Sequence, residues 1–572
     1  MVDALAEVEL LIQDGSVDFG DAAGGQAGME TKRLMLPADR NDRFLDGPAT
    51  RRIAVVDIDP ATGAPLPAPA QFVPAKPSLP TRGSFEYDGN PTSPATIAVN
   101  AFGTVFQTVR MFEGPDALGR QVTWAFGSEQ LLVVPRAGEW ANAFYDRSTR
   151  SLQFFWFPSS TGTTVYTALS RDIVAHECGH ALLDAVVPSL YDSATPQSIA
   201  IHEAVADLIA VLMALDSGSL RTAVLKRSGN SLAGPNAFSG IAEEFGMARP
   251  GPGGVARLAL RELHNQATLE DLANEQPHVL STLLSAIFYE TLASIFTVRH
   301  TAELDASEHD RESEVSPAAA ANKALGTAHV IFRRLLLRAI DYLPPGELSF
   351  ADVGRAALAA DRATLPDADA SETLRQQRRD FAQRFVRRLV VPAAEDLDSG
   401  RPSELDVPPT QIPQLHANDW VAYEYVTKHR DLLGIPAGSP FTVLPRIDAT
   451  KVIGPERDGV VPKQRELIMK VAWDHLEDSS ADVRGAQRRH LPTGATISLR
   501  WEDGRCLALV TSDVTGEQHR NARDALLLRL DEDGLLDAGD ADASARVGIR
   551  VADGAATLSS THRLLHLAGW ER

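Results

Sequence analysis

The sequence predicts an α+β protein of several domains. Its 572 residues are enough for two or three domains. Apolar residues recur with helical spacing near 170–215, 317–341 and 350–391, whereas 467–473, 495–501 and 506–510 have the pattern of strands. Proline-rich stretches at 60–80 and 396–413 separate these regions. Because 44% of the residues are hydrophobic, we expect most of the chain to be folded.

The remaining segments are assigned in chain order. Residues 1–50 are polar and mixed, and 53–58 resemble a strand. The stretch 60–80 is expected to be an extended arm or linker with no core of its own. The acidic segment 301–316 is expected to be a solvated loop, and 519–530 an amphipathic helix.

The most informative motif is His-Glu-x-x-His at residues 176–180. It lies in a predicted helix over 170–183, with Ser170 as its N-cap. Positions four apart share one helix face, so His176 and His180 can present ring nitrogens to one metal ion. Glu177 follows the first ligand and is placed to hold a water molecule without being a ligand itself.

A second predicted helix, 198–215, has Glu203 and Asp207 on one face. Pro188 and Pro196 turn the chain between the two helices, which can then lie side by side. Glu203 would complete a His2Glu set with an open fourth position, and Asp207 would hydrogen-bond a ligand histidine. The alternative, two ordinary core helices, must explain five polar groups at inward positions where charges are rarely buried unpaired. We therefore favour a metal site.

Residues 176–207 resemble the active-site helix pair of thermolysin-like metallopeptidases, in the wider gluzincin group. The stretch 180–184 is similar to the family's H-A-x-x-D, and 202–207 to its N-E-A-x-x-D, with His202 in place of the asparagine. Tyr191, eleven residues after His180, stands where the family has its transition-state tyrosine.

Two flanking segments extend the resemblance. Residues 140–145 are similar to the family's N-A-F-W edge strand, which implies that the Asn142 side chain and the Ala143 carbonyl bind the substrate backbone. Residues 278–289 are similar to its H-x-x-S…Y helix, whose histidine, here His278, is the second transition-state donor. Substrate contacts are also implied for three further residues: Arg261 at the substrate carbonyl, and Ile173 and Leu260 as apolar walls.

The resemblance covers about residues 95–390 and implies a two-lobed metallopeptidase domain. We expect an N-terminal extension with a proline-rich arm at 1–94, and a β-rich N-lobe with the active-site helix at 95–184. A helical C-lobe at 185–395, a linker at 396–415 and an α+β module at 416–572 follow. This last module has no catalytic constellation and is expected to recognise a partner or substrate protein.

The implied activity is that of a zinc-dependent endopeptidase with one catalytic Zn2+. Glu177 would assist attack of a zinc-bound water on the peptide bond, and Tyr191 and His278 would stabilise the oxyanion. A bulky apolar residue after the scissile bond is the expected preference. Two alternatives stay open: a gluzincin hydrolase of a narrow amide or short-peptide substrate, and a catalytically silent zinc-containing binding protein.

Composition limits the partners and the compartment. A net charge of −21 argues against nucleic acid and anionic membranes as partners. Asp172 matches one calcium position of the family, but the rest of that acidic cluster is not found, so Ca2+ is left open. Cys178 and Cys506 are far apart and predict no disulfide framework, with Cys178 a packed thiol. No membrane span or signal peptide is recognised, so cytoplasmic residence is expected, with non-classical secretion left open.

Overall fold

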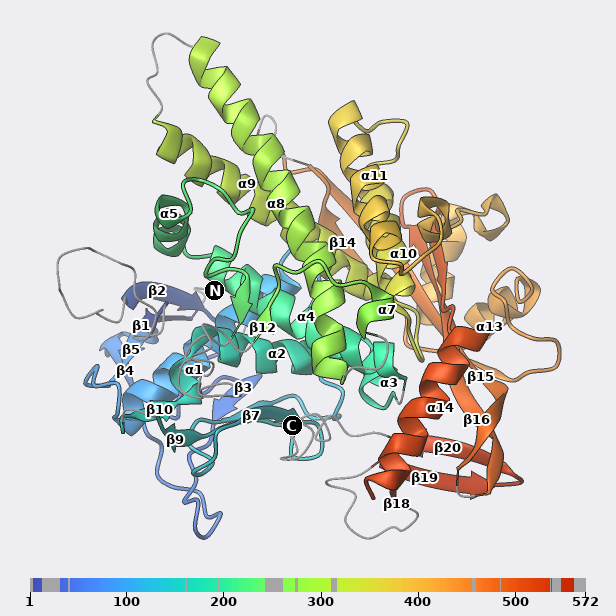
Figure 1. Cartoon of the computed structure of the whole chain (residues 1–572). Coiled ribbons are helices and arrows are strands. Elements are labelled where there is room, and N and C mark those ends of the chain that lie inside the picture. The colour runs from blue at the N-terminus through green and yellow to red at the C-terminus, as the bar shows by residue number, and fades with distance from the viewer. Residues whose placement is uncertain are drawn as a thin grey trace.

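The computed structural model describes residues 4–12, 31–39, 42–159, 162–193, 195–241, 261–272, 276–309, 316–454, 459–483, 485–534, 536–537 and 547–559. These residues form an α+β protein, as predicted. Long helices occupy the middle of the chain, and the longest strands follow residue 460. Figure 1 shows the helices (green and yellow) lying between the N-terminal sheets (blue) and a C-terminal sheet (orange and red).

Two four-stranded sheets form the N-terminal part. The first has the order β2-β1-β5-β4 and the second β3-β6-β8-β7. Helix α1 (Pro94–Glu113) packs against both β1 and α2 (Arg171–Val186), the helix that carries the His-Glu-x-x-His motif. The strands are β1 (Leu5–Leu11), β2 (Thr31–Pro37), β3 (Ile53–Val55), β4 (Phe72–Lys76), β5 (Leu79–Phe85), β6 (Leu131–Val134), β7 (Ala143–Asp146) and β8 (Ser151–Phe154), with β9 (Trp156–Pro158) and β10 (Thr164–Tyr166) pairing separately.

Residues 1–94 differ from the extension that we expected, because their described part belongs to the main core. Strand β1 alternates buried Ala6, Val8 and Leu10 with more exposed glutamates, and these apolar side chains join the large cluster around α1. Strand β1 also pairs in parallel with β5, beyond the proline-rich stretch. That stretch is largely exposed at 59–69, as an arm would be, but it then enters the sheet as β4.

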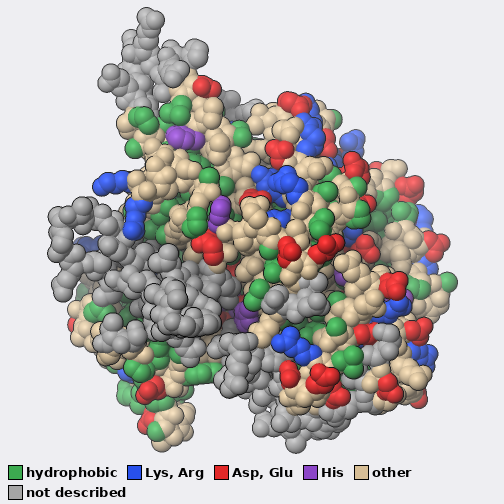
Figure 2. Space-filling view, in the orientation of Figure 1, with side chains coloured by type: hydrophobic (Ala, Val, Ile, Leu, Met, Phe, Trp, Pro, Cys, Tyr) green, Lys and Arg blue, Asp and Glu red, His purple; other side chains and the backbone are tan. Residues whose placement is uncertain are grey.

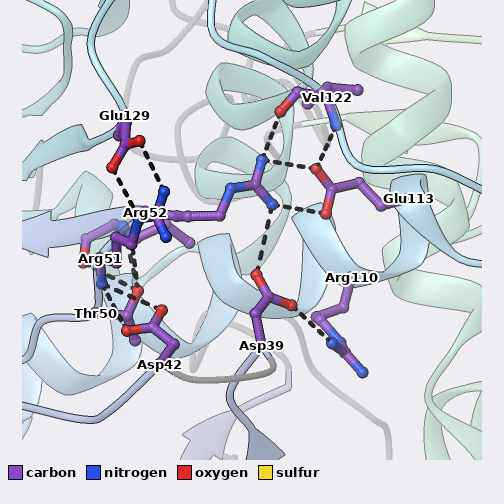
Figure 3. A network of polar contacts seen from close by, with 10 residues as sticks. Asp39, Asp42, Thr50, Arg51, Arg52, Arg110, Glu113, Val122 and Glu129 are labelled. Atoms are coloured by element: carbon purple, nitrogen blue, oxygen red, sulfur yellow. Dashed lines mark hydrogen bonds and ion pairs between the residues drawn. The ribbon is translucent and has the colours of Figure 1, made fainter. Parts of the chain in front are cut away.

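A polar network fixes this region to α1 (Figure 3). The Arg52 guanidinium donates two hydrogen bonds of 2.7 Å to the Glu113 carboxylate and one of 2.9 Å to the Val122 carbonyl. Asp39 accepts a hydrogen bond of 3.1 Å from Arg110, one turn earlier on α1. The segment before α1 is therefore bound to the last turn of that helix by paired charges.

The middle of the chain is helical. Its elements are α2 (Arg171–Val186), α3 (Pro188–Tyr191), α4 (Pro196–Leu215), α5 (Gly218–Arg227), α7 (Leu269–Leu272), α8 (Pro277–His309), α9 (Pro317–Tyr342), α10 (Phe350–Thr364) and α11 (Glu372–Arg387), with the short pair β11 (Gly240–Ile241) and β12 (Arg261–Glu262). The helix predicted over 350–391 is two helices, because Pro366 disfavours a helical residue before it and Ser371 caps the second. The prediction of a loop at 301–316 is wrong for residues 301–309, which form the end of α8.

The strands predicted after residue 460 are confirmed, and each is longer than expected. The C-terminal sheet has the order β13-β15-β16-β20-β19-β18, with β14 on β15 and β17 on β16. Its elements are β13 (Phe441–Val443), β14 (Ile447–Val452), β15 (Lys463–Val483), β16 (Ala486–Arg500), β17 (Cys506–Thr511), β18 (Leu536–Asp537), β19 (Val547–Ala552) and β20 (Ala555–Ser559), accompanied by α12 (Ile412–Ala417), α13 (Asp419–Lys428) and α14 (Glu517–Glu532).

This sheet packs into the helical body. Leu397 and Leu405 of the expected linker are fully buried, and Ile468 and Val510 belong to the same apolar cluster as α9 and α10. A buried polar cluster crosses the junction: Tyr342 at the end of α9 donates a hydrogen bond of 2.9 Å to Glu466 on β15. The C-terminal region is therefore continuous with the helical body.

Lys470 on β15 contacts the end of α2. Its ammonium group donates to the carbonyl of Val186, the last residue of α2, at 3.3 Å. Complete burial lowers the pKa of Lys470 to about 7; Asp341 opposes this shift, and Arg120 and Lys451 add to it. The unfolded chain therefore binds a proton that the folded chain does not between about pH 7 and 10.5, so this group makes stability rise with pH across that window.

We expect Lys470→Met to remove that rise. The variant should be more stable than the wild type near pH 7, because a buried ammonium group is replaced by an apolar side chain of similar length. Thermal midpoints measured from pH 7 to 9.5 should converge as the pH increases. Lys463→Met, at an exposed position of the same strand, is the matched control and should run parallel to the wild type. A constant offset between the Lys470→Met and wild-type curves would contradict the expectation.

Among the described residues, two helices are long and apolar enough to cross a membrane: α4 and residues Pro277–Ala306 of α8. Within their most apolar windows, 94% and 72% of the residues are buried in the protein, as is typical of core helices.

Figure 2 shows acidic and basic side chains interspersed on the visible face.

Candidate metal centre

Two neighbouring helices bring three metal-binding side chains together. The ligand atoms of His176 and His180 on α2 and of Glu203 on α4 lie within 4.8 Å of one another. The two Nε2 atoms are 2.9 Å apart, and the Glu203 oxygens lie 3.5 and 3.4 Å from them. Metal–ligand distances of about 2.0–2.1 Å in a tetrahedral zinc site place neighbouring ligand atoms about 3.3 Å apart. The three side chains therefore fit a zinc ion.

The close approach of α2 and α4 depends on a small residue between the two histidines. A Cβ atom at Gly179 would lie 3.1 Å from the Cα atom of Ala206 on α4, which is tighter than ordinary contact. A larger residue at either position would push the helices apart and separate Glu203 from the histidines. Gly179 is thus a packing requirement of the site.

Glu203 is fully buried, yet it is held in its charged form. Burial raises the pKa of its carboxyl, but His278, His180 and His176 together outweigh burial and hold the pKa well below its ordinary value. The Nε2 atom of His278, at the start of α8, lies 3.3 Å from Glu203 Oε2. The structure therefore brings His278 to the cluster of His176, His180 and Glu203, and Glu203 is deprotonated, as binding of a metal ion would require.

The other ring nitrogens of the two ligand histidines also have partners. His176 Nδ1 donates to Asp207 Oδ1 at 2.9 Å, which leaves its Nε2 lone pair for a metal. His180 Nδ1 lies 2.6 Å from His202 Nδ1, and the two rings stack with centroids 4.8 Å apart. We assign the shared proton to His180, because its Nε2 faces the ligand cluster. His202 then orients His180 as Asp207 orients His176.

Glu177, the residue after His176, contacts the backbone of the edge strand. The Tyr145 N–H on β7 donates to Glu177 Oε2 at 3.0 Å. No role was predicted for Tyr145. Its donor is a backbone N–H, which almost every residue type has, so the sequence does not indicate it. This contact orients one carboxylate oxygen of Glu177.

Tyr191, in α3, is buried beside both β7 and His202. Its ring packs edge-on against Tyr145, with centroids 5.7 Å apart, and against His202, with centroids 6.0 Å apart. Its hydroxyl oxygen accepts a hydrogen bond of 3.4 Å from the Arg147 N–H. Burial raises the pKa of Tyr191, so the phenol stays protonated near neutral pH and able to donate.

The candidate substrate-binding residues lie on the edge of a sheet. Strand β7 is last in the order β3-β6-β8-β7, and Asn142 precedes it directly. The Asn142 side-chain oxygen accepts a hydrogen bond of 2.8 Å from the Ala143 N–H. Ile173 lies on α2 one turn before Glu177, and is 9% exposed. Leu260 and the side chain of Arg261 lie outside the described residues.

Two further residues of α2 were singled out from the sequence. Cys178 is completely buried, its thiol faces the Val105 carbonyl at 3.9 Å, and burial raises its pKa, as expected of a packed thiol. Asp172 accepts hydrogen bonds from the Ser170 hydroxyl and from the Ile173 N–H. Its carboxylate thus serves the first turn of α2.

No protein-family model matches the sequence, and no curated protein matches it.

Proposed function

We propose that this chain is a zinc-dependent endopeptidase with the two-lobed arrangement of thermolysin-like enzymes. One observation carries the proposal: Glu177 follows His176 on the helix that supplies two members of the His176, His180 and Glu203 cluster, and its carboxylate, which is not needed to hold a metal, is fixed by the Tyr145 N–H. A purely structural zinc site would be closed by four protein ligands and would need no adjacent carboxylate.

The chain's own groups account for proton transfer. His176, His180 and Glu203 would hold the zinc ion, which would supply a Lewis acid for the scissile carbonyl and for the attacking water. Glu177, with Oε2 held by Tyr145, accepts a proton from the water and passes it to the leaving amine. Asp207 and His202 keep the ligand rings in the tautomer that binds metal.

In this proposal, His278 and Tyr191 donate hydrogen bonds to the charge that develops on the substrate carbonyl oxygen. In support, His278 at the start of α8 contacts Glu203, and Tyr191 in α3 packs against His202. Preorganised donors of this kind act on the transition state more than on the substrate. An extended peptide substrate would pair with the edge strand β7 through backbone hydrogen bonds beside Ala143.

A second candidate is a hydrolase of a narrow amide or short-peptide substrate. The burial of the edge strand favours it: Ala143 is 7% exposed, and both Phe144 and Tyr145 are 2% exposed. A short ligand needs less of this strand than a polypeptide does. We prefer the endopeptidase because strand addition gives affinity for peptide backbone of any sequence.

Metal removal and readdition tests both candidates. Purified full-length protein should contain about one zinc per chain and should cleave a reduced, unfolded protein at internal bonds before bulky apolar residues. A chelator should abolish cleavage, and about one equivalent of zinc should restore it. Zinc-dependent hydrolysis of short peptides alone would favour the second candidate. Bound zinc with no hydrolysis of either substrate would contradict both.

A further inference from the structure

The guanidinium of Arg147, which follows the edge strand β7, binds three residues. Its Nε donates to Asp184 Oδ2 at 2.9 Å, and a second donor of the guanidinium binds the other oxygen of that carboxylate. It also donates to Asp192 at 2.8 Å and to the Pro188 carbonyl at 2.6 Å. Asp184 lies on α2, one turn after His180, and is completely buried. The guanidinium is thus fixed between the active-site helix and α3.

The same guanidinium covers Tyr191. Its Cζ atom lies 4.2 Å from the centroid of the Tyr191 ring, and the backbone N–H of Arg147 donates to the Tyr191 hydroxyl oxygen at 3.4 Å. Tyr145 and His202 pack edge-on against the ring. One residue therefore contacts both the face of the phenol and its oxygen.

We propose that Arg147 is a positioning residue for Tyr191, holding the phenol in place and strengthening its hydroxyl as a hydrogen-bond donor. The inference rests on the proposed function, in which Tyr191 donates to the oxyanion. The hydroxyl oxygen accepts from the Arg147 N–H, a contact that fixes the oxygen and does not use the hydroxyl proton. A cation over the ring face withdraws electron density from the phenol oxygen, and chains of hydrogen bonds polarise one another.

The contacts of Asp184 support a role for Arg147 beyond attaching β7 to α2. Asp184 also accepts a hydrogen bond of 2.7 Å from the Tyr145 hydroxyl, and Tyr145 supplies the N–H that holds Glu177. Arg147 and Asp184 together therefore join the elements that carry the general base and the phenol. A salt bridge needed only to attach β7 to α2 would not require the guanidinium to lie on the Tyr191 ring.

A double-mutant cycle tests whether Arg147 acts through Tyr191. We expect Arg147→Met to lower kcat for peptide hydrolysis about tenfold with little change in KM, and Arg147→Lys to recover part of the loss. In a Tyr191→Phe background, Arg147→Met should change kcat less than about twofold, because the hydroxyl is already absent. An equal loss in both backgrounds would mean a structural role and would overturn the proposal.

Folding is controlled with a charge-balanced variant. Arg147→Met leaves Asp184 buried and unpaired, which destabilises proteins strongly, so Arg147→Met with Asp184→Asn is made in parallel. The carboxamide oxygen that Asp184→Asn introduces can still accept from the Tyr145 hydroxyl. If this folded variant has wild-type kcat, Arg147 does not assist Tyr191.

A measurement without metal or substrate separates this inference from the proposed function. In metal-free protein labelled with 3-fluorotyrosine, the 19F resonance that is absent from Tyr191→Phe belongs to Tyr191. We expect Arg147→Met to shift and narrow that resonance, because the ring loses a charged contact and turns more freely. An unchanged resonance would overturn the proposal. A shifted resonance in a protein that cleaves no peptide would support the contact and contradict only the peptidase assignment.

Discussion

Replacing Glu177 by glutamine should lower kcat/KM for peptide hydrolysis by about 10²–10⁴-fold while leaving zinc bound. Glutamine has nearly the same shape, and its side-chain oxygen can still accept the Tyr145 N–H. What it lacks is a carboxylate that takes a proton. The three ligand side chains are unchanged, so zinc content should stay at about one per chain.

The comparison of activity with metal content decides among the candidate functions. Zinc content measured on the protein used for the assay shows that the site is intact. Glu517→Gln, at a position where the side chain is 79% exposed, is the matched control for loss of one negative charge and should be fully active. Activity retained in Glu177→Gln would remove Glu177 from the mechanism. A zinc-containing wild type that is as inactive as the variant would favour a binding protein.

Local spacing explains how much of the site could be predicted. His176 and His180 are four apart on one helix, as are Glu203 and Asp207, so each pair shares a face whatever the rest of the fold does. The structure brings both pairs together and adds His278 from α8. The prediction of His278 depended on the family resemblance, because no local periodicity indicates that α8 packs against Glu203.

The contacts that were missed depend on backbone groups or on distant pairing. The Tyr145 N–H that holds Glu177 is independent of the side chain at that position. No role was predicted for His202, which replaces the family's asparagine at a position that is not a ligand, and its contact with His180 forms only when α4 packs against α2. Arg147 meets Asp184 only after β7 and α2 have packed, so its role follows from the tertiary structure.

In the fold, too, local patterns predicted individual elements but not the contacts between distant ones. Helices α2, α4 and α9 and strands β15, β16 and β17 were predicted because their hydrophobic pattern is continuous, whereas α1 and the remaining strands of the C-terminal sheet were not predicted. The assignment of 1–94 to an extension failed because β1 pairs with β5 across more than seventy residues, and no local pattern encodes a parallel partner. The burial of Lys470 at the end of α2 likewise follows from packing, since a lone lysine in a strand usually faces water.

Replacing Glu203 by glutamine should weaken zinc binding more than any change among the groups that orient the ligands. The neutral amide keeps the volume of the side chain but is a poor ligand for zinc, so the cluster loses one of its three protein ligands. Asp207→Asn is the matched comparison: it weakens only the partner of His176 Nδ1 and should cost about 10–100-fold in affinity. The loss in Glu203→Gln should exceed that range.

The increase in thermal midpoint on adding zinc measures this without an activity assay. A ligand that binds the folded state stabilises it in proportion to the logarithm of its concentration over Kd. Each variant is compared with its own metal-free form, because Glu203→Gln also removes a carboxylate that three histidines surround. We expect a large zinc-induced increase in the wild type, a smaller one in Asp207→Asn, and almost none in Glu203→Gln. Equal increases in all three proteins would mean that zinc binds elsewhere, because loss of a ligand must weaken the site that contains it.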